Sequence, residues 1–311
     1  MPDERFWTEK DLVDGKCPDC RRAVERIAEK NYFFRISKYQ DWLIEYLDTH
    51  RDFIQPRYRR NEVLGYLSEP LGDWCITRPI ERLDWGIRLP FDQDYVTYVW
   101  FDALINYLTA GGFHSDNEKF ARLWPTATHL IGKDILILHA VYWPAMLRAI
   151  GIPLPRTIFA LGWWNVDGTK ISKSHGNAIK PLELADVYGT DAFRYFLMRD
   201  MTSGRDADFS EELLRSRYDS TLANDLGNLA HRLVSMIVQY CDGVVPEAGR
   251  EGTSESELRE HCTGLVPKVF GCLDRLELTR FGGHLETWGY HPRKGSSHAE
   301  DESTISARIQ G

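Results

Sequence analysis

The chain has 311 residues, of which 43% are hydrophobic and 12% aromatic; this length and composition suit a globular protein of two domains. Its formal net charge of −8 excludes a protein that holds nucleic acid by bulk positive charge, so any contact with a polyanion has to be local. No apolar run is long enough to cross a bilayer, the start of the chain is no signal peptide, and the six cysteines are too sparse for a disulfide framework. A cytoplasmic protein without membrane contact is expected.

The amino-terminal residues 1 to 30 are polar and have little apolar periodicity. They contain one Cys-x-x-Cys pair, Cys17 and Cys20. A tetrahedral zinc site needs four ligands, and a second pair is missing, so bound zinc is not expected. From 32 to 50 the apolar and aromatic residues recur at helical spacing, which predicts a helix.

Strands and helices then alternate. The segments 94–101, 128–132 and 156–166 are predicted strands. Between the last two, residues 133–151 predict a helix of about four turns that ends at Gly151. A strand, a helix and a strand joined by short loops indicate a right-handed crossover and a parallel sheet.

After Gly176 the signals are helical. Pro181 is the expected first residue of one helix, and Thr190 or Asp191 is the expected cap of the next. An all-helical domain is expected to begin near residue 211. The segment 282–311, rich in Gly, Ser, His and charge, has little apolar pattern and is expected to be irregular.

The first candidate binding face follows the strand at 94–101. Trp100, Ala103 and Tyr107 stand at i, i+3 and i+7, so they share one face of a helix that Asp102 is expected to cap. Ligands of open parallel sheets bind at the carboxyl ends of the strands, which is where this face is expected. An aromatic stripe packed in the core is the alternative.

A second candidate face follows the strand at 128–132. Ile135, His139 and Trp143 recur every four residues, so an imidazole lies between an aliphatic and an indole side chain, as in an apolar pocket with one polar group. A histidine satisfied within the core is the alternative. Upstream, Gly132 permits close backbone approach, and Asp134 stands where nucleotide folds place a ribose-binding carboxylate or an ordinary helix cap.

The stretch DGTKISKSHGN, residues 167–177, carries Lys170 and Lys173 in an expected loop after a strand. It is not a Walker loop, because the glycine-rich run before the lysine is missing. Two ammonium groups at this place suit phosphate oxygens whose charge grows in a transition state. A solvated lysine turn is the alternative.

The segment KISKS at 170–174 resembles the KMSKS signature of class I aminoacyl-tRNA synthetases, with Ile in place of Met. Among these enzymes the chain is similar to the bacterial methionyl-tRNA synthetases from about residue 4 to 275. The segments that carry this likeness are NYFFRISKYQDWL, YVWFDALINYL, HLIGKDILILHAVYWPAML and GTKISKSHGN. The resemblance implies ATP-dependent activation of methionine to methionyl-adenylate and transfer to tRNA(Met), with Mg²⁺-ATP as a substrate.

The resemblance also assigns roles to residues of this chain. It implies a methionine pocket with aromatic walls that suit a polarizable thioether, formed by Val99, Trp100, Ala103, Tyr107, Ile135, His139 and Trp143. It implies an ATP site at Gly132, Asp134, Lys170, Ser172 and Lys173, in which the two lysines are catalytic. In the helical domain it implies that Asn228 and Arg232, four residues apart, read the tRNA anticodon, because amide and guanidinium groups suit unpaired bases.

Three departures from the family pattern matter. Leu138 stands where some relatives have an aromatic residue. Cys17 and Cys20 look like half of the zinc knuckle in the family's connective insertion. The second class I signature, His-Ile-Gly-His, is absent from the sequence. The segment HLIG at 129–132 is similar to it, but it lacks the second histidine and stands at another place. The chain is therefore expected to correspond to a carboxyl-terminal portion of a synthetase and to be inactive in adenylate formation on its own.

The expected fold is α/β: a partial Rossmann-type parallel sheet with flanking helices, followed by an all-α anticodon-binding domain. The expected domains are an insertion remnant (1–50), the second half of the catalytic domain (51–210) and an incomplete helical domain with an irregular tail (211–311). Two alternative functions remain open. One is a non-catalytic tRNA-binding module. The other is a class I synthetase for leucine, isoleucine or valine, against which the missing editing insertion and the aromatic-plus-histidine pocket speak.

Overall fold

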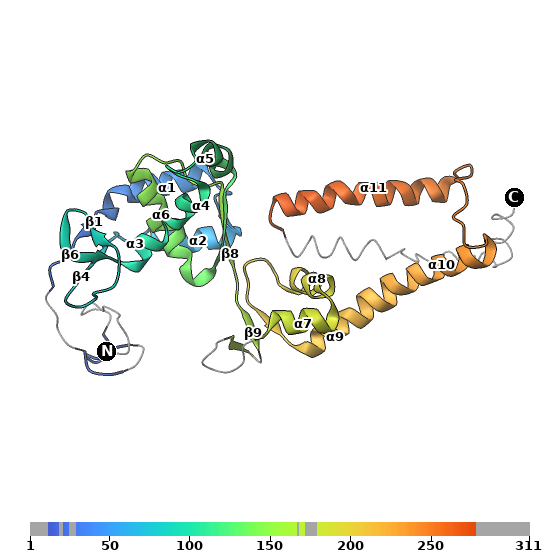
Figure 1. Cartoon of the computed structure of the whole chain (residues 1–311), viewed down its shortest axis with the longest axis horizontal. Coiled ribbons are helices and arrows are strands. Elements are labelled where there is room, and N and C mark those ends of the chain that lie inside the picture. Colours follow the sequence, from blue (N-terminus) through green and yellow to red (C-terminus); the bar gives the residue numbers. More distant parts are fainter. Residues whose placement is uncertain (1–11, 19–20, 25–28, 167, 172–178, 278–311) are drawn as a thin grey trace. The chain divides into compact units, whose positions relative to one another are not determined.

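The computed structural model describes residues 12–18, 21–24, 29–166, 168–171 and 179–277. The chain divides into two compact units. The first comprises Met1–Gln40 and Pro70–Phe120, and the second comprises Asp41–Glu69 and Ala121–Gly311 (Figure 1). The chain therefore enters the second unit, returns to the first and then remains in the second.

The first unit is built on short antiparallel pairs of strands. One pair joins β1 (Phe33–Phe34) to β3 (Trp74–Cys75). A three-stranded sheet in the order β4-β6-β5 joins β4 (Thr77–Pro79), β6 (Asp92–Thr97) and β5 (Arg88–Leu89). The helices that follow are α3 (Val99–Ala103), α4 (Asn106–Gly111) and α5 (Asn117–Leu123), whose last residues belong to the second unit.

The prediction of a strand over 94–101 is wrong at its carboxyl end. The strand β6 stops at Thr97 and is antiparallel to both neighbours, so it does not end at the edge of a parallel sheet. The amide of Tyr98 still donates to the carbonyl of Ile76 at 2.7 Å. The carbonyl of Tyr98 then accepts the first hydrogen bonds of α3, from the amides of Phe101 and Asp102. Asp102 lies inside α3 and does not cap it, since Tyr98 occupies the N-cap position.

The second unit contains the predicted parallel sheet. Its strands are β2 (Ile54–Gln55), β8 (Thr157–Leu161) and β7 (Thr128–Gly132), in the order β2-β8-β7 and all parallel. The central strand β8 is almost wholly buried. Two helices flank β2 in sequence, α1 (Gln40–Thr49) and α2 (Arg57–Tyr66), and Arg60 of α2 ties them together by donating to the carbonyl of Leu47 at 2.8 Å. The predicted helix over 32–50 thus holds only for its second half, after β1 and a 3₁₀ turn (Ile36–Tyr39).

The crossover between β7 and β8 is helical as predicted, but it is not one uniform α-helix. A 3₁₀ turn (Lys133–Ile135) leads into a π-helical turn (Leu138–Tyr142) and then into α6 (Trp143–Ala149). Pro144 lacks an N–H and its ring crowds the carbonyl four residues earlier, so a wider turn before it accommodates the ring. Gly151 follows with φ of +72°, a conformation that favours glycine.

The predicted strand over 156–166 is two strands of different sheets. After β8, Gly162 and Trp163 interrupt the pairing, and β9 (Trp164–Val166) pairs in parallel with β11 (Ala207–Phe209) and antiparallel with β10 (Thr169–Lys170). The backbone of Arg205 lies so close to Gly162 that a side chain would overlap its carbonyl group. Glycine is therefore required at this junction.

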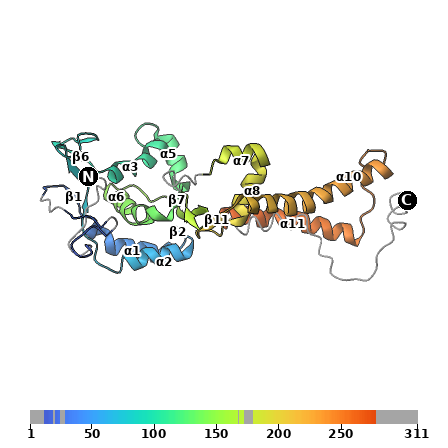
Figure 2. The same ribbon diagram turned by 90° about the horizontal axis from the view of Figure 1, so that it is seen from below.

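Helices make up the rest of the described chain: α7 (Pro181–Tyr188), α8 (Thr190–Asp200), α9 (Glu211–Arg217), a π-helical segment (Tyr218–Gly227), α10 (Asn228–Tyr240) and α11 (Thr253–Asp274). As predicted, Pro181 is the first residue of its helix. Gly189, however, occupies the N-cap of α8, so neither Thr190 nor Asp191 caps it. Figures 1 and 2 show α10 as a long helix that continues the chain from α9.

An apolar core holds this helical part to β9 and β11. It consists of Phe193 and Phe196 of α8, Phe209 of β11 and Leu214 of α9, with Trp164 of β9 packed against it. These residues come from both sides of position 211, where the helical domain is expected to begin. The predicted irregular tail, 282–311, lies outside the described residues. Within the described part, none of the helices combines the length and apolar character that crossing a bilayer requires.

The cap of α9 gives a test of how this helical part is anchored. The hydroxyl of Ser210 accepts a hydrogen bond from the amide of Leu213 at 3.1 Å. Replacing Ser210 with alanine is expected to lower the free energy of unfolding by about 1 kcal/mol, because one helix N–H loses its acceptor. Urea denaturation followed by circular dichroism measures this change. Ser210→Asp keeps an acceptor and should retain most of the stability; an equal loss in both variants would contradict the capping role.

Candidate functional site

The candidate site lies at the carboxyl end of β7, where the chain leaves the parallel sheet through Gly132. Asp134 is exposed there, and the indole Nε1 of Trp163 donates to its Oδ1 at 3.2 Å. A Cβ on Gly132 would come within 2.6 Å of the same oxygen. The two predicted ATP-site residues are thus neighbours at a strand end, and only glycine leaves the carboxylate in this position.

Two residues that the sequence did not single out organise this end of the sheet. Lys133 donates from Nζ to Oδ2 of Asp206 at 2.6 Å and lies 4.0 Å above the ring centre of Trp163. Oδ1 of Asp206 accepts from the backbone N–H of Trp163 at 2.9 Å. The hydrogen bond from Lys133, followed by that from Trp163, lowers the pKa of Asp206. Because Asp206 directly precedes β11, these contacts join the ends of β7 and β8 to the second sheet.

The three residues of the second predicted face lie on the crossover helix. Trp143 is fully buried and His139 is 2% exposed, whereas Ile135 is half-buried. Nδ1 of His139 lies 2.9 Å from the carbonyl oxygen of Ile135. A carbonyl only accepts, so Nδ1 carries the proton and Nε2 is the acceptor nitrogen of this ring. Burial lowers the pKa of His139, although the bond to Ile135 opposes that shift. The ring is therefore held neutral in one tautomer.

A second buried histidine, His129 of β7, was missed by the sequence reasoning. Its Nε2 accepts a hydrogen bond from the indole Nε1 of Trp143 at 3.1 Å, and its ring centre lies 6.3 Å from that of His139. Burial, and then the neighbouring His139, lower its pKa to about 4. The alternation of β7 could have found it, because His129 and Ile131 face the same buried side.

The four other residues of the predicted methionine pocket belong to the first unit. Val99, Trp100 and Ala103 are on α3, and Tyr107 is on α4 after a break at 104–105, so the expected single helix is two short ones. Burial raises the pKa of the Tyr107 hydroxyl. The structure thus places one group of pocket residues in each unit.

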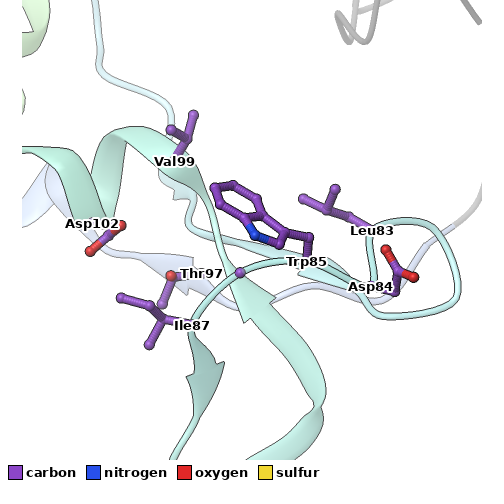
Figure 3. A pocket seen from close by; sticks show the side chains of 8 residues that line it. Leu83, Asp84, Trp85, Ile87, Thr97, Val99 and Asp102 are labelled. Carbon is purple, nitrogen blue, oxygen red and sulfur yellow. The ribbon is translucent and has the colours of Figure 1, made fainter.

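Val99 is 58% exposed and lines a hollow of about 400 Å³ in the first unit. The other lining residues come from the loop before β5, from β6 and from α3: Leu83, Asp84, Trp85, Gly86, Ile87, Thr97 and Asp102. Figure 3 shows the Trp85 indole beside this hollow. Of the residues predicted for methionine, only Val99 lines it.

The residues of the lysine signature are described only in part. Lys170 lies in β10, whose backbone pairs with Asn165 of β9, so this lysine belongs to a hairpin strand and not to a loop. The hairpin turns at Gly168 with φ of +70°. Ser172 and Lys173 lie outside the described residues. The hairpin is thereby attached to the sheet that also contains β11.

The predicted anticodon residues lie on α10. Asn228 is its first residue and Arg232 follows one turn later, and both are exposed. Residues four apart share a helix face, so the two side chains are placed as predicted relative to each other. Exposed apolar residues occupy other positions of the same helix, including Leu229 and Leu233.

The cysteine pair is also described only in part. Cys17 is buried, and its backbone N–H donates to the carbonyl of Arg22 at 3.0 Å. Cys20 lies outside the described residues. Among the residues that are described, no group of three or more His, Cys, Asp or Glu side chains is placed to hold a metal ion.

A parallel sheet joined by a helical crossover, with a glycine and a carboxylate at the end of one strand, is the arrangement of the doubly wound α/β proteins. The comparisons with known proteins identify the particular family. The family of class I tRNA synthetases (M) matches residues 3–234, and the chain belongs to it.

The relatives agree with this assignment. The methionine–tRNA ligase of Caldanaerobacter subterraneus subsp. tengcongensis is 48% identical over 288 residues, which cover 92% of this chain, and that of Thermotoga maritima is 47% identical over 283 residues. Among solved structures, methionyl-tRNA synthetase of Mycobacterium tuberculosis bound by methionyl-adenylate superposes with a TM-score of 0.86 at 38% identity over 99% of this chain. The predicted family and the predicted α/β fold with a parallel sheet are confirmed.

The chain is shorter than these relatives. It spans 44% of the Caldanaerobacter ligase, 45% of the Thermotoga ligase and 63% of the Mycobacterium synthetase chain.

Proposed function

We propose that this chain takes part in methionine activation and in the charging of tRNA(Met) in the cytoplasm. The observation that carries the proposal is the position of Ile135, His139 and Trp143 on the crossover helix that directly follows Asp134 at the end of β7. An apolar surface with one polar group then adjoins a strand-end carboxylate, as an amino-acid pocket beside a nucleotide site requires. The names of the relatives support the same substrate.

The proposed reaction joins methionine to ATP. A carboxylate oxygen of methionine attacks the α-phosphorus, the bond to the bridging oxygen of the β-phosphate breaks, and pyrophosphate leaves with its Mg²⁺. Asp134 would accept hydrogen bonds from the ribose hydroxyls beside Gly132. Lys170 and Lys173, with Ser172, would stabilise the charge that grows on the phosphates. Positioning of the two substrates and stabilisation of the phosphate charge would then account for the acceleration of the reaction, without a covalent enzyme intermediate.

The proposed contacts to methionine are made by the residues that the family resemblance assigns to it. Aromatic edges and a neutral imidazole suit a thioether, because sulfur is polarizable and interacts favourably with aromatic rings. We include all seven predicted residues in this proposal: Val99, Trp100, Ala103, Tyr107, Ile135, His139 and Trp143. Asn228 and Arg232 are proposed to contact the anticodon from the exposed face of α10.

Isothermal titration of the chain with methionine, with leucine and with ATP tests this function. We expect methionine to bind and leucine to bind at least about tenfold more weakly, because a pocket selects by shape and by contacts to sulfur. Lys173→Ala serves as the matched variant, since it should weaken ATP binding and leave methionine binding unchanged. Preference for leucine, isoleucine or valine would favour a different class I synthetase instead.

A non-catalytic tRNA-binding module is the second candidate. The exposed pair Asn228 and Arg232 on α10 favours it, because these side chains need no substrate pocket to contact an unpaired base. Binding of tRNA(Met) by a chain that binds neither methionine nor ATP would support the module and contradict the activation site.

We further propose that the chain alone does not form methionyl-adenylate at a useful rate, since its sequence holds one of the two class I signatures. Methionine-dependent exchange of pyrophosphate into ATP by the purified chain would contradict this.

A further inference from the structure

A buried hydrogen bond joins β7 to the crossover helix. Trp143 is fully buried and His129 is 4% exposed, and the indole Nε1 lies 3.1 Å from Nε2 of His129. An indole N–H only donates, so Nε2 of His129 has to be the unprotonated nitrogen. The imidazole is therefore neutral, with its proton on Nδ1.

Neighbouring rings hold this pair in place from other sides. Trp124 meets the His129 ring at 6.1 Å and the Trp143 ring edge-on at 6.4 Å and 85°. Trp124 is itself anchored, because its Nε1 donates to the carbonyl of Pro153 at 2.7 Å. His139 meets His129 edge-on at 6.3 Å and 75°. The orientation of the Trp143 indole is thus set by a group on the sheet and not by its own helix alone.

The hydrogen bond from Trp143 to His129 matters for the helix because of where Trp143 stands in it. Trp143 follows the π-helical turn (Leu138–Tyr142), and that turn carries His139. A π-helical turn rotates the residues after it relative to the residues before it, compared with a regular α-helix. The bond to His129 therefore fixes how Trp143 stands relative to His139 and Ile135.

We propose that His129 is a positioning residue for the methionine pocket: its Nε2 holds the Trp143 indole in the orientation that the amino-acid side chain meets. This inference rests on the proposed function, since it assigns a further residue to the same site. A purely apolar residue at position 129 would fill the space but leave the indole N–H without this acceptor. The indole wall would then be present but would lack one of the contacts that orient it.

The test compares His129→Phe, which keeps a ring and removes the acceptor, with His129→Gln, whose amide oxygen replaces it. The first measurement is the indole ¹H–¹⁵N resonance of Trp143 in the full chain, assigned with Trp143→Phe. In the parent chain we expect slow exchange of this proton with solvent. In His129→Phe the resonance should shift and the proton exchange at least about tenfold faster, and His129→Gln should restore the slow exchange.

The second measurement is methionine binding by titration calorimetry with the same three chains. We expect His129→Phe to weaken methionine binding by about three- to tenfold, the equivalent of one hydrogen bond, and His129→Gln to restore most of it. Norleucine is the analogue of methionine in which a methylene group replaces the sulfur. The His129→Phe substitution should reduce its affinity less than it reduces the affinity of methionine. Urea denaturation of each chain shows whether a loss of binding merely follows a loss of stability.

The outcomes separate this inference from the proposed function. An unchanged indole resonance in His129→Phe, or a changed resonance with unchanged methionine affinity, would overturn the positioning role while methionine binding by the parent stands. Failure of His129→Gln to restore either signal would show a structural role only. If the parent chain binds no methionine, the proposed function fails and the pocket role fails with it, whereas the indole resonance still reports whether His129 holds Trp143.

Discussion

Truncating Trp143 to alanine is expected to lower the free energy of unfolding of the second unit by about 3 to 5 kcal/mol. The indole is fully buried, so the substitution leaves a cavity between β7 and the crossover helix. It also removes the donor that Trp143 provides to Nε2 of the buried His129. Both effects act in the same direction, and the loss approaches the whole stability of an ordinary domain.

Urea denaturation monitored by far-ultraviolet circular dichroism measures this loss. Trp85→Ala is the matched control, because the same side chain is removed from a position where it is 79% exposed. Its effect should stay within about 0.5 kcal/mol of zero. If the two variants lost similar amounts of stability, the buried packing of Trp143 would not be a main support of the unit.

The sequence predicted the parallel sheet because its signals are local. The strand over 128–132 and the crossover after it follow from alternation, helical spacing and Gly151, and the structure confirms them as β7, the helical crossover and the parallel pairing with β8. The sequence did not predict where β8 ends. That boundary depends on the close approach of Arg205 to Gly162, which lie more than forty residues apart, and a contact of this kind leaves no periodic trace.

In the candidate site, too, the sequence predicted local features but not the contacts between distant residues. The spacing of Ile135, His139 and Trp143 predicted three residues of one helix surface, but it could not distinguish a pocket from core packing, since both need buried apolar side chains. The partners of this surface come from other elements. His129 of β7 reaches Trp143, and Asp206 before β11 reaches Lys133. Such pairs depend on the tertiary fold, so single-sequence patterns could not assign them.

The resemblance to the class I synthetases added what spacing could not, because it selected a function among several open alternatives. The family match over residues 3–234 confirms the family, whereas the function of the chain is a proposal. The particular roles of Lys170, Asn228 and Arg232 remain predictions. Asn228 and Arg232 are exposed on α10, which is compatible with contacts to unpaired bases.

Acidification from pH 7 to pH 4 is expected to destabilise the second unit through the buried histidines. The pKa of His129 is lowered to about 4 by burial and by His139, whereas in the unfolded chain it should be near 6.5. Between these values the unfolded state binds a proton that the native state does not, so the free energy of unfolding falls as the pH falls. A difference of about 2.5 pKa units corresponds to about 3 kcal/mol. The pKa of His139 is lowered too and acts in the same direction.

Urea denaturation at several pH values between 7.5 and 4 measures this dependence, and His129→Gln isolates the contribution of one ring. The glutamine keeps an acceptor for the Trp143 indole but does not titrate, so its stability should depend on pH less steeply than that of the parent. The difference between the two chains should be small above pH 7 and should grow steadily below pH 6.5. Parallel pH curves for the two chains would mean that His129 takes up its second proton as readily in the native state as in the unfolded chain, which would contradict a hydrogen bond from the Trp143 indole to an unprotonated Nε2.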